Sequence, residues 1–392
     1  MTYEHFVSAQ SVFLWSTFAI AVIMGAVVNK TNFCTMGAVS DWINMGDTGR
    51  LRAWVLAIAI GVLGVTALEA AGLVNLSGTF PPYRQNSFVW LENVLGGAAF
   101  GIGMTLASGC ANKTLIRVGG GNLKSILVLL VIGVVAYFMV NPFPDSDKTL
   151  YSALFYPWTH PAAVALTTNQ DLGAMLFGDR VATGRLVMGV IVGILLLAWA
   201  FKSADFRGSF DNILGGVVVG LVVLVAWYVT SNIRMNADGD ILSLQAYVQD
   251  WDLYAPADAV RPAAAGPLAS QSFTFVNPMG QALGYAAKGF NHTFLTFGIM
   301  ALAGVITGSL LWSLISRSFR IEWFASVRDF FSHLVGAILM GFGGVLAMGC
   351  TIGQGITGFS TLALGSILTF VAIVFGSAVT MKLQYYLMMR GE

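Results

Sequence analysis

The sequence predicts an all-α polytopic membrane protein with about nine transmembrane helices and several short re-entrant helices. Of its 392 residues, 56% are hydrophobic and only 10% are charged, whereas about a quarter of a soluble protein is charged. Apolar runs of about 17 to 25 residues, the length of a transmembrane helix, recur along the chain. Two of these runs also resemble each other, which predicts two related halves.

The apolar spans predict the order of the helices. They cover residues 11–29, 53–74, 94–109, 123–140, 185–201, 213–230, 293–315, 333–349 and 363–389. The third and eighth spans are short for a hydrocarbon core of about 30 Å. We expect short helices after Val28, Cys110, Val229 and Cys350, each re-entering the membrane or lying at its interface.

The internal repeat is clearest in two segments rich in glycine. Gly96–Cys110 reads GGAAFGIGMTLASGC, and Gly336–Cys350 reads GAILMGFGGVLAMGC, at an offset of 240 positions. Paired apolar segments interrupted by glycine mark the binding site in many membrane carriers. The repeat therefore predicts a functional site where these two segments end.

The basic residues predict the orientation of the spans. Lys and Arg gather at alternate span ends, namely Arg50, Arg52, Lys113, Arg117, Lys124, Lys202, Arg207, Arg317, Arg320, Arg328, Lys382 and Arg390. The positive-inside rule places these ends in the cytoplasm. The long polar segments 141–184 and 231–290 are then outside, as is the N-terminus, and the C-terminus is inside.

The orientation divides the chain into four parts. Residues 1–140 form a first half of four spans and residues 208–392 a second half, and the linker span within 185–207 inverts the second half. Segment 141–184 is predicted to lie at the membrane interface. Segment 231–290 is rich in proline and carries Asp238, Asp240, Asp250, Asp252 and Asp258, so it is predicted to be an external loop or small cap. An inverted repeat places a site at mid-membrane between broken helices.

The three cysteines are the candidate site residues. Cys110 and Cys350 end the repeated segments after Gly109 and Gly349, whereas Cys34 stands alone, because the equivalent turn, which we place near Tyr228–Thr230, has no cysteine. A buried cysteine is often only a small apolar filler. The repetition of Cys110 and Cys350 argues for function, and for Cys34 both alternatives stay open.

Two polar neighbours complete the candidate site. Lys113 follows Cys110 closely, and Thr351 follows Cys350 directly. Lys113 is either a cytoplasmic anchor or a cation beside the path. Thiols, hydroxyls and helix N-termini suit a soft sulfur-bearing anion, because they bind it without a full counter-charge. We predict neutral thiols, no metal and no cofactor. The net charge of +1 makes nucleic acid an unlikely partner.

The cysteine motifs resemble those of a known family. The stretches NFCTMGA at 32–38, GIGMTLASGC ending at Cys110 and GFGGVLAMGC-TIGQG around Cys350 are similar to the YeeE/YedE family of bacterial inner-membrane sulfur-compound transporters. The resemblance covers about 30–140 and 210–390. It implies thiosulfate uptake along a path on which Cys34, Cys110 and Cys350 relay the ion by S–H···S contacts. It also implies a small cytoplasmic TusA-like sulfur carrier as partner.

Three other functions remain open at this stage. The substrate could be another sulfur or selenium compound. A membrane thiol oxidoreductase would need a cysteine pair that cycles through a disulfide, and no vicinal pair occurs in the sequence. A metal-ion carrier would use thiolates, but the sequence lacks the His, Met and acidic clusters expected around them.

Overall fold

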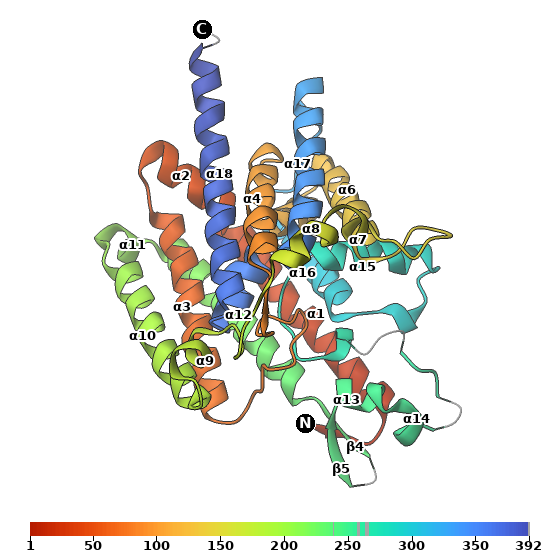
Figure 1. Ribbon diagram of the computed structural model, residues 1–392. Coiled ribbons are helices and arrows are strands. Elements are labelled where there is room, and N and C mark those ends of the chain that lie inside the picture. The colour runs from red at the N-terminus through yellow and green to blue at the C-terminus, as the bar shows by residue number, and fades with distance from the viewer. Residues whose placement is uncertain (238, 257–258, 263–265, 391–392) are drawn as a thin grey trace.

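A computed structural model of the chain describes residues 1–237, 239–256, 259–262 and 266–390. Asp238 and Asp258 of the predicted external segment lie outside this description. The described chain is mainly helical with very little sheet, as predicted, and Figure 1 shows its two ends at opposite ends of the molecule.

Nine helices of the described residues are long and apolar enough to cross a membrane, which confirms the predicted number. They are α1 (Phe6–Thr31), α3 (Gly49–Ala70), α4 (Trp90–Leu106), α6 (Leu123–Val140), α10 (Val181–Phe201), α12 (Phe210–Asn232), α16 (Phe297–Ile315), α17 (Val327–Leu346) and α18 (Leu364–Arg390). An odd number of crossings places the two ends of the chain on opposite sides of a bilayer.

Shorter helices connect the long ones. They are α2 (Thr35–Met45), α5 (Ala111–Gly119), α7 (Leu150–Leu154), α8 (Tyr156–Thr159), α9 (Leu172–Phe177), α11 (Ala204–Gly208), α13 (Leu244–Gln249), α14 (Trp251–Tyr254) and α15 (Val276–Ala287). The expected helices after Cys110 and Cys350 are present, the second as a helical stretch at 351–360 that includes a π-helical segment.

The other two expected short helices differ from the prediction. Helix α1 continues past Val28 to Thr31, because its apolar face still packs on α16, and α2 starts only at Thr35. No short helix follows Val229, because α12 runs on to Asn232 and the chain then forms strand β4 (Arg234–Ala237). The prediction of a helix after Val229 is wrong.

Helices α4 and α17 carry the repeated segments and pack directly on each other (Figure 1). A Cβ atom placed on Gly96 would lie 2.8 Å from the Gly343 carbonyl oxygen, and one on Gly336 would lie 2.6 Å from that of Gly103. The N-terminal part of each helix thus meets the C-terminal part of the other, so the helices are antiparallel. At the offset of 240 the two contacts are equivalent, as an inverted repeat requires, although the repeat itself stays a prediction.

Other helix pairs follow the same correspondence. The pairing of α1 with α16 has a counterpart in α12 with α3, and α4 with α18 has one in α17 with α6. Each pair is close because small residues bring the backbones together. For example, a Cβ on Gly308 of α16 would lie 2.0 Å from the Val22 carbonyl oxygen of α1. The linker helix α10 lies outside this scheme and packs on α3 and α9.

Parts of the two long polar segments contact the loop after α3 and the N-terminus. Strand β2 (Ser87–Phe88) pairs with β3 (Val164–Ala165), and β1 (Thr2–Tyr3) joins β4 and β5 (Asp240–Ser243) in a three-stranded sheet. The Phe80 N–H also donates to the Ser270 carbonyl at 3.0 Å. The two long polar segments and the loop after α3 therefore share one end of the molecule.

The second long segment is only partly a peripheral loop. Phe273, Phe275 and Val276 are fully buried, and α15 packs between α6 and α16. The expectation of an external loop over 231–290 therefore fails for its last part. An apolar run too short to span the membrane still enters the core here, because the neighbouring helices surround it.

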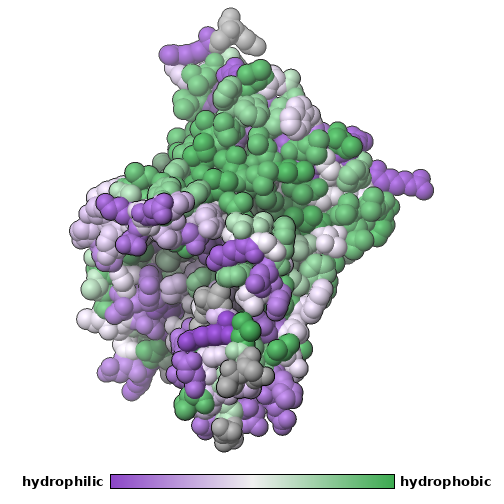
Figure 2. Space-filling view, turned by 90° about the vertical axis from the view of Figure 1, so that its right-hand side faces the viewer, coloured by the Kyte–Doolittle hydropathy of each residue, from purple (hydrophilic) through white to green (hydrophobic). Residues whose placement is uncertain are grey.

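The exposed apolar side chains indicate which part of the surface contacts lipid. Figure 2 shows hydrophobic side chains gathered in a broad region across one face, with hydrophilic ones towards the ends of the molecule. Large apolar side chains along α10 and α18 are exposed, including Leu195 at 64% and Phe375 at 66%. An exposed apolar surface of this extent marks contact with a membrane in a protein with nine spans.

Candidate functional site

The two repeated segments end in the same backbone structure. Ser108 after α4 and Met348 after α17 have positive φ angles of 57° and 55°. The Gly109 N–H then donates to the Met104 carbonyl, and the Gly349 N–H to the Gly344 carbonyl, both at 2.8 Å. These bonds close each helix in a Schellman-type turn. Each turn ends on its cysteine, so Cys110 and Cys350 occupy equivalent places.

Each of the three cysteines stands at the start of a short helix. Cys34 is the N-cap of α2, Cys110 is the N-cap of α5, and Cys350 directly precedes the helical stretch 351–360. The Gly353 N–H donates to Cys350 Sγ at 3.5 Å. The thiols of Cys34 and Cys110 face the N–H groups three residues further on in the same way. The cysteines therefore lie in the positive field of helix N-termini.

Two of the cysteines are neighbours. The thiol of Cys110 lies close enough to the Cys34 thiol and the Thr351 hydroxyl to interact with both electrostatically. We call Cys34 and Cys110 the inner cysteine site. Because Thr351 directly follows Cys350, it connects this pair to the third cysteine. The predicted residues Cys34, Cys110 and Thr351 are thus brought together, and all three cysteines are free and buried.

A basic cavity opens beside the inner cysteine site. It has a volume of about 790 Å³, and Cys34 forms part of its wall. Five cationic side chains line it, which we call the basic vestibule: Lys30, Arg50, Lys113, Arg117 and Arg320. Glu322 is the acidic residue in the same wall. A cavity whose charged side chains are mainly cations attracts small anions and raises their local concentration.

The cations of the vestibule differ in their partners. Arg50 forms a bidentate pair with Asp41, with Nε–Oδ2 and Nη2–Oδ1 distances of 2.5 and 2.6 Å. Lys30 lies 3.8 Å from Asp211. Lys113 donates to the side chain of Asn32 at 3.1 Å. Within the described part of the chain, Lys113, Arg117 and Arg320 form no ion pair, so their charge remains available to a ligand.

A glycine of the first motif makes room for this arrangement. A Cβ atom on Gly37 would lie 2.2 Å from Arg50 Nη1. Contacts closer than 3 Å do not occur for real Cβ atoms, so a larger residue here would displace the guanidinium. Gly37 therefore allows Arg50 to reach Asp41 at the edge of the vestibule. Arg50 and Arg117 entered the sequence analysis only as orientation signals, because cytoplasmic span ends and anion-binding sites both use Arg.

The third cysteine has different neighbours. Cys350 is fully buried, and its thiol lies beside the hydroxyl of Thr274 and close to Tyr83. We call Cys350 and Thr274 the outer cysteine site. Burial raises the pKa of the Tyr83 hydroxyl, and so does the nearby Cys350, so Tyr83 remains a protonated donor. The basic vestibule does not extend to Cys110 or Cys350 within the residues described.

Several buried polar groups around the cysteines lack well-formed hydrogen bonds in the described part of the chain. They include the hydroxyls of Thr35, Thr274, Thr351 and Tyr83, and the indole N–H of Trp54. A buried polar group without a partner is costly unless something else satisfies it. Five such donors lie on or next to the elements that carry the thiols. They are suited to receive a polar ligand.

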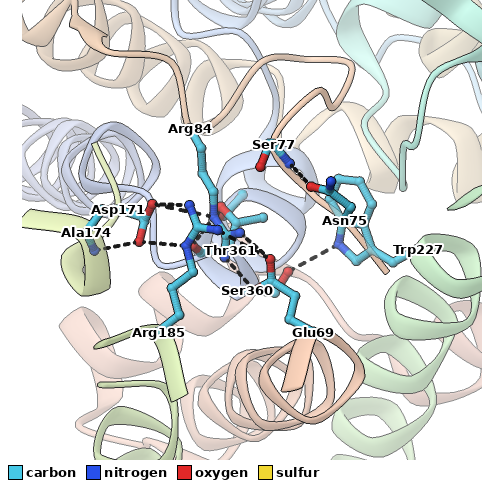
Figure 3. Close-up of polar contacts among 11 residues, drawn as sticks. Glu69, Asn75, Ser77, Arg84, Asp171, Ala174, Arg185, Trp227, Ser360 and Thr361 are labelled. Carbon is cyan, nitrogen blue, oxygen red and sulfur yellow. Dashed lines mark hydrogen bonds and ion pairs between the residues drawn. The ribbon is translucent and has the colours of Figure 1, made fainter. Parts of the chain in front are cut away.

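An ionic cluster holds the loop that carries Tyr83. Figure 3 shows the side chains of Arg84 and Arg185 reaching between the carboxylates of Asp171 and Glu69. Arg84 binds both oxygens of Glu69 and donates from Nε to the Thr361 carbonyl at 2.9 Å. Arg185 pairs with Asp171 at 2.7 Å. The cluster fixes residue 84, so the neighbouring Tyr83 is held against Gly358 and Cys350.

The glycines and Lys113 of the candidate set also lie at the site. A Cβ on Gly109 would lie 3.2 Å from Lys113 Cγ, and one on Gly349 would lie 3.2 Å from Gln354 Cγ and 3.4 Å from Thr274 Oγ1. The sequence analysis missed Thr274 and Tyr83. The sequence does contain a signal that could have identified Thr274. The pair Phe273-Thr274 lies 240 positions after Phe33-Cys34, which is the offset that relates Cys110 to Cys350.

The chain is similar to known transport proteins along most of its length. The family model described as Sulphur transport matches residues 30–379. The thiosulfate transporter TsuA of Escherichia coli (strain K12) is 25% identical over 341 residues, covering 85% of this chain and 84% of that protein. The thiosulfate transporter TsuA of Spirochaeta thermophila is 22% identical over 372 residues, covering 93% and 97%.

Proposed function

Because the chain belongs to the sulphur-transport family, we propose that it takes up thiosulfate or a similar small sulfur oxyanion across the bacterial inner membrane. The anion passes Cys350, Cys110 and Cys34 in turn and leaves through the basic vestibule. The observation that carries this proposal is the chain of contacts from Cys34 to Cys110 to Thr351, next to Cys350. It connects three buried thiols to an anion-attracting cavity.

The relay is non-covalent. A neutral thiol donates a weak hydrogen bond to the terminal sulfur of thiosulfate, while hydroxyls and helix N–H groups bind its oxygens. A thiolate would repel the anion. A thiolate that attacked the substrate sulfur would form an adduct whose release limits transport. Weak contacts at successive sites let the ion enter and leave, as conduction requires. Lys113 stabilises the ion where the path meets the vestibule.

The decisive experiment is uptake of ³⁵S-thiosulfate into vesicles that contain only this protein. We expect uptake by the wild type and none by the double variant Cys110→Ala, Cys350→Ala. Full uptake by the double variant would remove the thiols from the mechanism. Intact-protein mass during turnover tests the non-covalent relay. A persulfide or thiosulfonate adduct on Cys110 or Cys350, formed at the transport rate, would refute it.

The proposed orientation places the basic vestibule in the cytoplasm, and it places segment 141–184 and the first part of segment 231–290 outside, with two inverted halves joined by the span within 185–207. Ser146 in segment 141–184 and Asn44 in α2 are both exposed. In whole cells, an impermeant maleimide should label Ser146→Cys directly and Asn44→Cys only after permeabilisation. The reverse pattern would overturn the orientation.

The vestibule also provides a place for transfer to the proposed TusA-like sulfur carrier. Its cations would hold the arriving anion within reach of a protein at the cytoplasmic face. Pull-down of such a carrier by the full-length protein tests this partner, with the charge-reversal variant Arg320→Glu as control. Equal recovery with both proteins would argue against docking at the vestibule.

A further inference from the structure

We propose that Thr274 and Tyr83 form, together with Cys350, an outer binding station for the transported anion, in which hydroxyl groups replace the thiol and the cation of the inner end. This inference rests on the proposed function, because it assigns residues to the same path. It adds two binding residues that belong to none of the three cysteine motifs. It also names the chemistry of their ligand, a small anion with a sulfur end and an oxygen end.

The first argument is the equivalence of Thr274 and Cys34. Phe33-Cys34 precedes α2, and Phe273-Thr274 precedes α15, at the same offset of 240 that relates Cys110 to Cys350. The contact between Cys34 and Cys110 has its counterpart in the contact between Thr274 and Cys350. Thr274 therefore stands where an unbroken repeat would place a fourth cysteine.

The second argument is the unsatisfied bonding capacity of the two hydroxyls. Thr274 is 8% exposed and Tyr83 is 2% exposed, and neither side-chain oxygen has a well-formed partner among the described residues. Thr274 Oγ1 lies next to Gly349 and Gly353, on either side of Cys350, and the Tyr83 ring lies against Gly358 in the helical stretch that follows Cys350. Leaving a buried hydroxyl without a partner is unfavourable. A ligand oxygen at this point would satisfy both donors while its sulfur faces Cys350.

The third argument is the charge of the two sites. At the offset of 240, Lys113 corresponds to Gly353 and Arg117 to Thr357. The outer station therefore binds the anion with neutral donors and with the N-terminal ends of two helices, the helical stretch 351–360 and α15. A full cation in a closed site would hold the anion too tightly for rapid transfer, whereas neutral donors allow its release. The chemistry suits thiosulfate, whose soft sulfur meets the thiol and whose oxygens meet the hydroxyls.

The first experiment measures the concentration dependence of thiosulfate uptake by purified full-length variants in vesicles. Thr274→Val keeps the shape and removes the hydroxyl, and we expect its KM to rise about tenfold, as for a lost hydrogen bond to a charged group. Thr274→Ser should stay within about twofold of the wild type, because the donor remains. Tyr83→Phe should raise KM about threefold, because it removes only the second donor.

The matched control is Thr17→Val in α1. The Thr17 hydroxyl is equally buried but donates to the Phe13 carbonyl of its own helix, so its loss should leave KM unchanged. A wild-type KM for Thr274→Val would refute the station while leaving the proposed function in place. Absence of uptake by the wild type itself would instead refute the proposed function.

A second variant tests the same site even if Thr274→Val fails to fold. Thr274→Cys restores the fourth thiol of the repeat, and we expect it to transport. Thiosulfate should slow alkylation of the introduced thiol by iodoacetamide at least about threefold relative to chloride of equal ionic strength, as expected for a directly occupied site. Peptide mass spectrometry separates this position from Cys34, Cys110 and Cys350. Equal alkylation rates in a transporting variant would overturn the proposal.

Discussion

At the inner cysteine site Cys110 stands beside Cys34 and Lys113, whereas at the outer cysteine site Cys350 stands beside Thr274 and Gly353. The backbone is the same in both places, with a helix that ends in a left-handed residue, a glycine and a cysteine. The side chains differ in charge and in access. The inner site adjoins a cavity of about 790 Å³, and Cys350 is fully buried.

The comparison shows which features of the path both ends need. A thiol at the end of a broken helix occurs twice, so we propose that thiols serve the passage itself. Cations line the cavity beside the inner site, so we propose that they favour movement of the anion towards that end. In the proposed orientation, an anion enters against an inside-negative potential, which costs about 2.3 kcal/mol per charge for each 100 mV. The basic vestibule offsets part of this cost where it is greatest.

The largest expected effect tests whether the two repeated thiols are equivalent. Cys110→Ala and Cys350→Ala should each lower vesicle uptake about a hundredfold, which corresponds to about 2.7 kcal/mol of lost stabilisation. The Ser variants should lose about tenfold, because a hydroxyl is shorter and harder but still donates. Initial uptake rates measure the effect. Normal uptake by either Ala variant would show that the shared backbone does not mean a shared role.

The next effect concerns space at the two sites. A Cβ on Gly353 would lie 2.4 Å from Thr274 Oγ1, whereas one on Gly109 would meet the flexible Lys113 side chain at 3.2 Å. Gly353→Ala should therefore reduce uptake about tenfold, and Gly109→Ala about twofold at most, because overpacking a closed site costs more. Both proteins should fold, as size-exclusion profiles would show. Equal losses would mean that both sites are equally closed.

A smaller effect concerns charge. Lys113→Gln removes an unpaired cation from the inner site, and we expect thiosulfate binding to weaken about fivefold, the size of one partly screened charge contact. The loss should shrink at high salt, because salt screens charge interactions. Titration calorimetry at two ionic strengths measures it. A salt-independent loss would assign Lys113 a structural role.

The smallest effect separates Cys34 from its partner. Cys34→Ala should lower uptake only about threefold, because Lys113 and the cavity still hold the anion after the loss of one weak donor. Parallel uptake assays of Cys34→Ala and Cys110→Ala test the ranking. A loss as large as that of Cys110→Ala would show that the vestibule cannot replace the thiol.

The sequence could predict the nine spans and the paired cysteines, because hydropathy and repeated glycines are local signals. It could not predict Thr274. A long segment separates the end of α12 from Thr274, whereas α1 ends just before Cys34. The turn equivalent to Cys34 is therefore predicted near Tyr228–Thr230, where α12 continues instead. A single substitution, Thr for Cys, also removed the residue type that marks the other three positions.

Sequence patterns also could not predict the basic vestibule or the ionic cluster. Lys30, Arg117 and Arg320 come from three separate elements and form one cavity only after the helices pack. The bidentate pair of Glu69 with Arg84 depends on a loop whose course no periodicity describes. Tertiary contacts of this kind can be predicted only when the three-dimensional fold is known.

The ionic cluster around Arg84 also constrains how the chain is assembled. Glu69 and Arg84 are 15 residues apart and Asp171 and Arg185 are 14 apart, so each pair can form soon after its segment is synthesised. The Arg84 bond to Thr361 spans 277 residues and must wait for nearly the whole polypeptide. The position of the loop that carries Arg84 and Tyr83 therefore depends on the C-terminal segment.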